Sequence, residues 1–171
     1  AVFGLHVAQT IGTGIIHPEV IDAHVIFAAL IGAIVWNLVT WGLGMPSSSS
    51  HALIGGLLGA GLAKAGTSVM VWSGLSKTLL AIVLSPLVGF LLALLLTAIV
   101  SWAAVRSTPF AVDRAFRILQ FASASLYSLG HGGNDAQKTM GIIAVLLYSQ
   151  GYLGGEFSVP FWVVIACQAA M

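Results

Sequence analysis

Two long stretches without a charged side chain most constrain the fold of this chain. Residues 23–63 contain no Asp, Glu, Lys or Arg over 41 consecutive positions, and residues 78–105 contain none over 28. A helix of ~20 apolar residues is enough to cross the hydrocarbon core of a bilayer. The first stretch is therefore long enough for two helices, and the second predicts one crossing that tilts or bends near Pro86.

The composition of the whole chain agrees with a membrane protein. Charged residues make up 6% of the sequence and hydrophobic residues 58%, whereas soluble domains carry about 25% charged residues. The net charge of +1 and the lack of a basic run argue against a nucleic-acid partner. The single cysteine, Cys167, cannot form an internal disulfide, and we expect a buried thiol there. We therefore expect an all-α, multi-pass membrane protein whose partners are the lipid bilayer and a small solute.

Charges and prolines divide the chain into expected helices and loops. The expected helical segments are residues 1–16, 24–45, 51–63, 78–105, 121–148 and 157–171. Residues 106–120, with Arg106, Arg114 and Arg117, are expected to be an interfacial linker on the cytoplasmic side, because basic loops favour that side. The chain begins and ends inside apolar runs, so it is expected to be a fragment of a longer protein.

The serine station, residues 46–51, interrupts the first apolar stretch. Pro46 ends a preceding helix, and serine is a favoured N-cap for a following one. Free N–H groups, the positive end of the helix dipole and the hydroxyls of Ser47 to Ser50 would together bind an anion. The segment is either the link between two crossings or the tip of a re-entrant hairpin, and a serine-rich surface loop is the plainer alternative.

The aspartate station, residues 131–141 (HGGNDAQKTMG), places polar residues inside an apolar segment. Because unpaired polar groups in hydrocarbon cost several kcal/mol, we expect the helix to break at the paired glycines and to restart at Asp135. Asn134, Asp135 and Gln137 supply oxygens that suit small cations. Lys138 is expected to pair with Asp135 or with an anion. The plainer alternative is a helix break stabilised by that pair.

The two stations together suggest a coupling mechanism. An anion near Asp135 is repelled by about 4 kcal/mol per unit charge pair at 4 Å and an effective dielectric of ~20. A cation or a proton at Asp135 removes this repulsion, so the binding of anion and cation becomes mutually dependent, as symport requires. Asn37 and Thr40, which share a helix face, are expected to be interhelical hydrogen-bond partners.

The motifs GMPSSSSHALIGGLLGAG and HGGNDAQKTMGII resemble those of the inorganic phosphate transporter (PiT) family. The resemblance implies an inverted-repeat secondary transporter with broken or re-entrant helices, located in the plasma (inner) membrane. It assigns residues 1–105, with the serine segment 46–51, to the later part of the first repeat. Residues 106–120 become the inter-repeat linker, and residues 121–171 the start of the second repeat.

The resemblance also implies roles for individual residues. Phosphate would be bound by Ser47, Ser48, Ser49, Ser50, Asn134 and Asp135. The coupling cation would be held by Asn134, Asp135 and Gln137, with Lys138, Thr139 and His51 as supporting positions. No cofactor or resident metal is implied beyond the co-transported sodium or proton, and a homodimer is implied. Each repeat of the family carries one motif of each kind, so this chain would hold half a site and would not transport alone.

Two other functions remain open at this point. A passive anion channel would share the serine station but would need no cation. An intramembrane serine hydrolase could use Ser50, His51, His131 and Asp135, but the sequence lacks a Gly-x-Ser-x-Gly elbow, and adjacent helical side chains point apart. We therefore expect a cation-coupled phosphate symporter that works by alternating access, rather than an enzyme.

Overall fold

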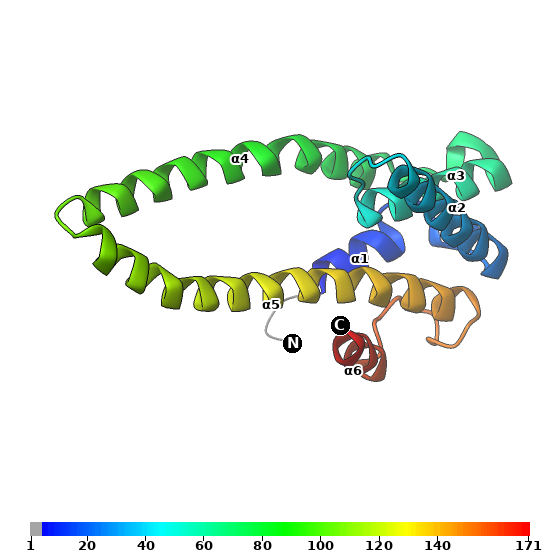
Figure 1. Cartoon of the computed structure of the whole chain (residues 1–171). Helices are drawn as coiled ribbons and strands as arrows, with labels where there is room; N and C mark the ends of the chain where they lie inside the picture. Colours follow the sequence, from blue (N-terminus) through cyan, green and yellow to red (C-terminus); the bar gives the residue numbers. More distant parts are fainter. Residues whose placement is uncertain (1–4) are drawn as a thin grey trace. The chain divides into compact units, whose positions relative to one another are not determined.

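A computed structural model describes residues 5–171, and the start of the segment expected at residues 1–16 lies outside this range. The helices are α1 (His6–Thr13), α2 (Ala23–Gly42), α3 (Ser49–Ala65), α4 (Trp72–Ala104), α5 (Pro109–Ser149) and α6 (Phe161–Ala170), with short 3-10 turns at η1 (Pro18–Val20) and η2 (Gly66–Val69) (Figure 1). No strand forms within the described range, where an isolated bridge joins Ile16 to Met70. The expected all-α class is confirmed.

Three segments of the described chain are long and apolar enough to cross a membrane. They are Ala23–Gly42, Ser49–Val69 and Trp72–Ala104. The first two match the expected pair around the serine station, and the second reaches the length for a crossing by continuing past the uncharged stretch, through Lys64 to Val69. Helix α4 begins earlier than expected and continues through Pro86 to Ala104.

Helix α5 corrects one expectation. It runs unbroken from Pro109 to Ser149, so the expected helix break in the aspartate station is absent. A continuous helix pairs every interior backbone group, and it costs only about 1 kcal/mol for each glycine. Most of the expected linker, residues 109–120, is helical, because the Thr108 hydroxyl accepts a hydrogen bond from Ala111 N (3.4 Å) and Pro109 occupies the first helical position. The role of residues 106–120 as a linker between repeats stays a prediction.

The chain divides into two compact units. One consists of residues 1–75 and 133–171, and the other of residues 76–132. The second unit contains parts of α4 and α5 joined by the turn at 105–108, and none of its residues is buried. The exposed apolar side chains of α4 among them suit contact with lipid.

The first unit has two hydrophobic clusters. The larger joins residues of α1, α2, α3, η2 and α5, and its buried members are Ile11, Ile15, Ile16, Ile21, Val25, Ile26, Ala29, Leu57, Val69, Ile142 and Val145. The smaller joins α1, α5 and α6 through Ala8, Ala136, Met140, Val163 and Cys167. The Cys167 thiol is free and buried, as expected.

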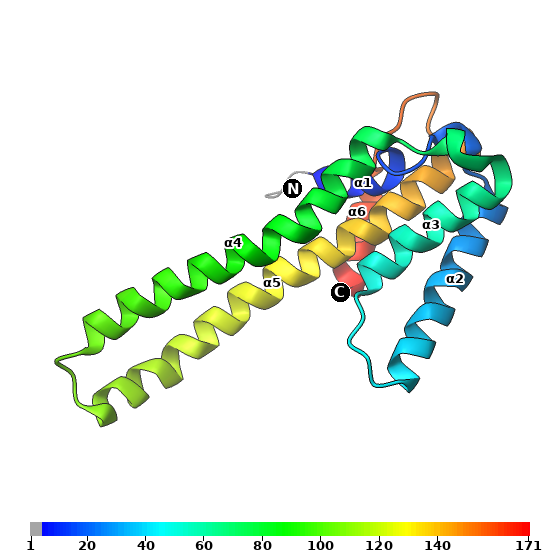
Figure 2. The same cartoon turned by 90° about the horizontal axis from the view of Figure 1, so that it is seen from above.

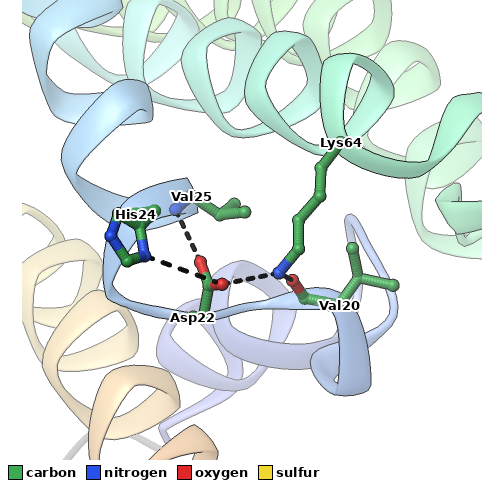
Figure 3. Close-up of polar contacts among 5 residues, drawn as sticks. All are labelled: Val20, Asp22, His24, Val25 and Lys64. Atoms are coloured by element: carbon green, nitrogen blue, oxygen red, sulfur yellow. Dashed lines mark hydrogen bonds and ion pairs between the residues drawn. The ribbon is translucent and has the colours of Figure 1, made fainter.

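Helices α2 and α3 form an antiparallel pair that packs closely at Gly56. A Cβ atom added there would lie 2.3 Å from the carbonyl oxygen of Ala29, so the backbones approach more closely than any side chain permits. At one end of the pair, Lys64 Nζ donates to Asp22 Oδ2 (2.7 Å) and to the carbonyl oxygen of Val20 (2.8 Å) (Figure 3). Asp22 Oδ1 also caps α2 by accepting from Val25 N (2.9 Å).

Candidate functional site

The serine station connects α2 to α3 in an extended form. Gly44 has a positive φ of 67°, which glycine adopts without steric cost, and it turns the chain after α2. Ser48 is the N-cap of α3, and its hydroxyl oxygen accepts a hydrogen bond from His51 N at 3.4 Å. The expected serine cap is therefore confirmed. The N–H groups of Ser49 and Ser50, in the first turn of α3, have no carbonyl partner within the helix.

Asn37 joins the serine station from α2. The Ser47 hydroxyl donates to Asn37 Oδ1 at 3.4 Å. Thr40 instead donates within its own helix, to the carbonyl oxygens of Trp36 (2.9 Å) and Asn37 (3.1 Å). Of the two expected interhelical partners, Asn37 thus contacts the loop after its helix. The sequence alone did not assign Asn37 to the site. Asn37 and Ser47 are ten positions apart, and only the turn after α2 brings them into contact.

The aspartate station lies on one helix, α5. Asp135 and Lys138 form an ion pair one turn apart, and their side chains are 26% and 20% exposed. This contact confirms one of the two partners expected for Lys138. Asn134 and Thr139 are exposed on the same part of the helix.

Gln137 has a different environment from its neighbours. It is only 7% exposed, and its Oε1 accepts a hydrogen bond from Val7 N at 3.2 Å. Val7 lies in the first turn of α1, where N–H groups lack helical partners. In this structure the Gln137 oxygen therefore stabilises the start of α1, which constrains how it could also bind a cation.

The aspartate station contributes Ala136 and Met140 to the smaller hydrophobic cluster, and Ile142, directly after it, belongs to the larger one. Asp135, Lys138 and Ile142 follow an i, i+3, i+7 spacing and so share one face of α5. Ile142 packs in the cluster that contains Leu57 of α3. Both stations precede these core residues on their own helices, and α3 and the C-terminal part of α5 run in the same general direction in both views (Figures 1 and 2). Within the first unit, the serine station and residues 133–141 therefore lie toward the same end.

The polar contacts described above do not join one station to the other. The serines form hydrogen bonds with Asn37 and His51. On α5, Lys138 contacts Asp135, and Gln137 accepts a hydrogen bond from α1. Within residues 5–171, no group of three or more His, Cys, Asp or Glu side chains is arranged to hold a metal ion.

A groove runs along the α2–α3 pair next to the serine station. Its volume is about 440 Å³, and it is lined by Ala28, Gly32, Trp36, His51, Ala52, Gly55, Gly56, Gly59 and Ala60. His51 is exposed and links this groove to the N-terminus of α3. The lining is mostly glycine and alanine, which permits close approach of another helix or of a solute to the backbone.

Similar proteins have been described in several bacteria. A probable low-affinity inorganic phosphate transporter of Rhizobium meliloti is 75% identical over 99% of this chain, and one of Bacillus subtilis is 42% identical over 96%. These alignments cover 51% and 50% of the two relatives, so the chain spans about half the length of the relatives it matches. A solved structure titled "The sodium-dependent phosphate transporter" shares the fold, with a TM-score of 0.71 and 21% identity over 97% of this chain and 60% of that one.

The family comparison covers the whole chain. Residues 1–171 match the family described as the phosphate transporter family. The family and these relatives are named as transporters rather than enzymes, which argues against the serine hydrolase. Together with the three apolar helices of spanning length, the match identifies an integral membrane protein. The chain belongs to the phosphate transporter family.

Proposed function

We propose that the longer protein containing this chain carries inorganic phosphate across the plasma membrane together with sodium or a proton, by alternating access. The proposal is supported by the capped start of α3, whose first-turn N–H groups lack helical partners, and by the ion-paired carboxylate of Asp135, both of which belong to the first unit. The relatives named as phosphate transporters support the choice of anion. The division into a first repeat (1–105) and a second repeat (121–171) stays a prediction.

Phosphate binding begins with the serine station. The first-turn N–H groups of Ser49 and Ser50 and the positive end of the α3 dipole attract an anion, and the hydroxyls can donate to its oxygens. Ser48 already accepts a hydrogen bond from His51 N, so its own hydroxyl proton is available to phosphate. Asn37 fixes the position of Ser47.

Lys138 would couple the anion to the cation. In this structure the ammonium group of Lys138 neutralises Asp135. A phosphate that binds near α5 competes for Lys138, because a multiply charged anion attracts the ammonium more strongly than a single carboxylate does. Asp135 then loses the positive charge of Lys138, and sodium or a proton can replace that charge. Each solute thereby favours the binding of the other.

Sodium is the first cation to test. The solved transporter of the same fold is described by its title as sodium-dependent. The carboxylate of Asp135 and the amide oxygen of Asn134 are ligands that small hard cations accept. Gln137 can contribute only if its oxygen also tolerates the bond from Val7 N, and an amide oxygen has two lone pairs.

The test is radiolabelled phosphate uptake by proteoliposomes that contain the full-length protein. Sodium and proton gradients are imposed separately, and Asp135→Asn and Lys138→Met are compared with the intact protein. Asp113→Asn is the matched control, because Asp113 also pairs with a basic residue on α5 but is 62% exposed. We expect uptake to follow one gradient, to be lost in both station variants and to persist in the control.

Other outcomes decide between the alternatives. Uptake that ignores both gradients would establish a passive anion channel. Failure of any form to take up phosphate, with correctly folded protein in the membrane, would contradict phosphate as the substrate. Cross-linking of the purified protein in liposomes tests the homodimer implied by the family resemblance, and a single monomer band would contradict it.

A further inference from the structure

The corner between α4 and α5, residues 102–117, combines unpaired basic residues with exposed aromatic ones. It carries three arginines and one acidic residue, a net charge of +2. Asp113 pairs with Arg117, whose Nε lies 3.0 Å from Asp113 Oδ2. Arg106 and Arg114 have no ion-pair partner in the part of the chain that the structure describes. Two guanidinium groups are therefore available to an external anion.

Apolar side chains accompany these arginines. Trp102 is 80% exposed, Val105 73% and Phe110 78%. Phe110, Arg114 and Arg117 follow an i, i+4, i+7 spacing, so they share one face of α5. A basic face with aromatic anchors is typical of helices that lie at a membrane surface, and tryptophan is enriched there.

Helix α4 fixes where this corner lies relative to a bilayer. Its hydropathy is the highest of the three segments of spanning length, and none of its most apolar window is buried within the protein. The uncharged stretch 78–105, which contains most of α4, ends at Val105, and Arg106 follows directly. When lipid covers α4, the next residues of the chain enter the headgroup layer.

We propose that the α4–α5 corner is a binding surface for anionic phospholipid headgroups. The guanidinium groups of Arg106 and Arg114 bind headgroup phosphates, because a guanidinium matches two phosphate oxygens at once. Trp102 and Phe110 lie at the boundary with the acyl chains. The attraction of an anionic lipid surface for basic residues close to it supports the same occupant. Free inorganic phosphate offers similar oxygens but no acyl chain to cover the aromatic residues, so the observations favour lipid.

The test measures which lipids contact Trp102 in the full-length protein. The protein is reconstituted into phosphatidylcholine bilayers that contain brominated phosphatidylglycerol or brominated phosphatidylcholine at equal fractions. The fluorescence difference between the intact protein and Trp102→Phe isolates quenching at Trp102. We expect stronger quenching by the anionic lipid. Equal quenching by the two lipids would contradict the proposal, whatever the variants show.

Charge variants then test the arginines. Each arginine near an anionic surface contributes about fivefold to binding, so Arg106→Gln/Arg114→Gln should lower the preference for phosphatidylglycerol by about 25-fold. Arg106→Lys/Arg114→Lys should lower it less, because an ammonium keeps the charge but not the paired contact of a guanidinium. Lys77→Gln, an exposed lysine close to the other end of α4, is the matched control and should change nothing. An equal loss in the Lys77 variant, or displacement of the lipid by millimolar inorganic phosphate but not by chloride at equal ionic strength, would overturn the assignment.

Discussion

Lys64 and Asp22, which lie 42 positions apart in the sequence, meet at one end of the α2–α3 pair with 2.7 Å between Nζ and Oδ2. Asp22 thereby performs two tasks, because its other oxygen accepts from Val25 N and caps α2. The same lysine donates to the carbonyl oxygen of Val20. One carboxylate therefore connects the start of α2 to the end of α3.

The two tasks of Asp22 can be separated by substitution. Asp22→Asn keeps a side-chain oxygen for the cap and loses the charge that attracts Lys64, whereas Asp22→Ala loses both. We expect Asp22→Ala to lower the melting temperature of the full-length protein more than Asp22→Asn does. Thermal unfolding in detergent measures this order. Equal melting temperatures for the two variants would show that the cap contributes nothing.

Lowering the pH should weaken the ion pair between Lys64 and Asp22. The hydrogen bond from Lys64, followed by that from Val25 N, holds the pKa of Asp22 below its ordinary value of 3.8. Because the folded-state pKa is the lower one, the ionised carboxylate stabilises the fold above pH 3.8, and this contribution is lost as the pH falls through the folded-state pKa. The difference in melting temperature between the intact protein and Lys64→Met, measured from pH 7 to pH 3, should begin to narrow below pH 3.8. A constant difference would contradict this origin.

Substitution of alanine for two glycines of α3 should change the stability of the protein in opposite directions. At Gly56 a Cβ would meet the Ala29 carbonyl oxygen at 2.3 Å, and backbone cannot move aside cheaply, so Gly56→Ala should cost about 1–3 kcal/mol of unfolding free energy. At Gly59 a Cβ would meet nothing within 4 Å, so Gly59→Ala should stabilise by up to about 1 kcal/mol. Denaturant or thermal unfolding compares them. Similar behaviour of both variants would contradict the close α2–α3 contact.

The continuity of α5 can be tested at Gly133. A Cβ there would meet nothing within 4 Å, and the residue lies inside the helix, so Gly133→Ala should raise stability by up to about 1 kcal/mol. Thermal unfolding in detergent measures the gain. A marked loss of stability would instead favour the broken helix that the paired glycines suggested.

The side-chain oxygen of Gln137 should stabilise the start of α1. Gln137→Leu leaves the N–H of Val7 without its partner and should cost about 1–3 kcal/mol of unfolding free energy. Gln137→Glu keeps an acceptor oxygen and should be milder. Hydrogen exchange at the amides of α1 measures the effect locally. Unchanged protection of Val7 in Gln137→Leu would show that the bond does not stabilise α1.

Much of this architecture follows from the sequence pattern. The uncharged stretches predicted α2, α3 and α4, because apolar length is what a bilayer requires of a helix. Pro46 and the serines predicted a helix start, and Ser48 caps it. The motifs predicted the phosphate transporter family. These features depend on neighbours within a few positions, and local sequence therefore reveals them.

Only the tertiary structure decided the partners of the polar residues and the shape of α5. The glycines and Asp135 resembled a helix break, yet packing of Ala136, Met140 and Gly141 on one face of α5 supports a continuous helix. Gln137 resembled a cation ligand, yet its oxygen accepts a hydrogen bond from an amide 130 positions away. Residue type and spacing determine what a side chain can bind, but the contacts that compete for it come from distant parts of the chain, and only folding brings those parts together.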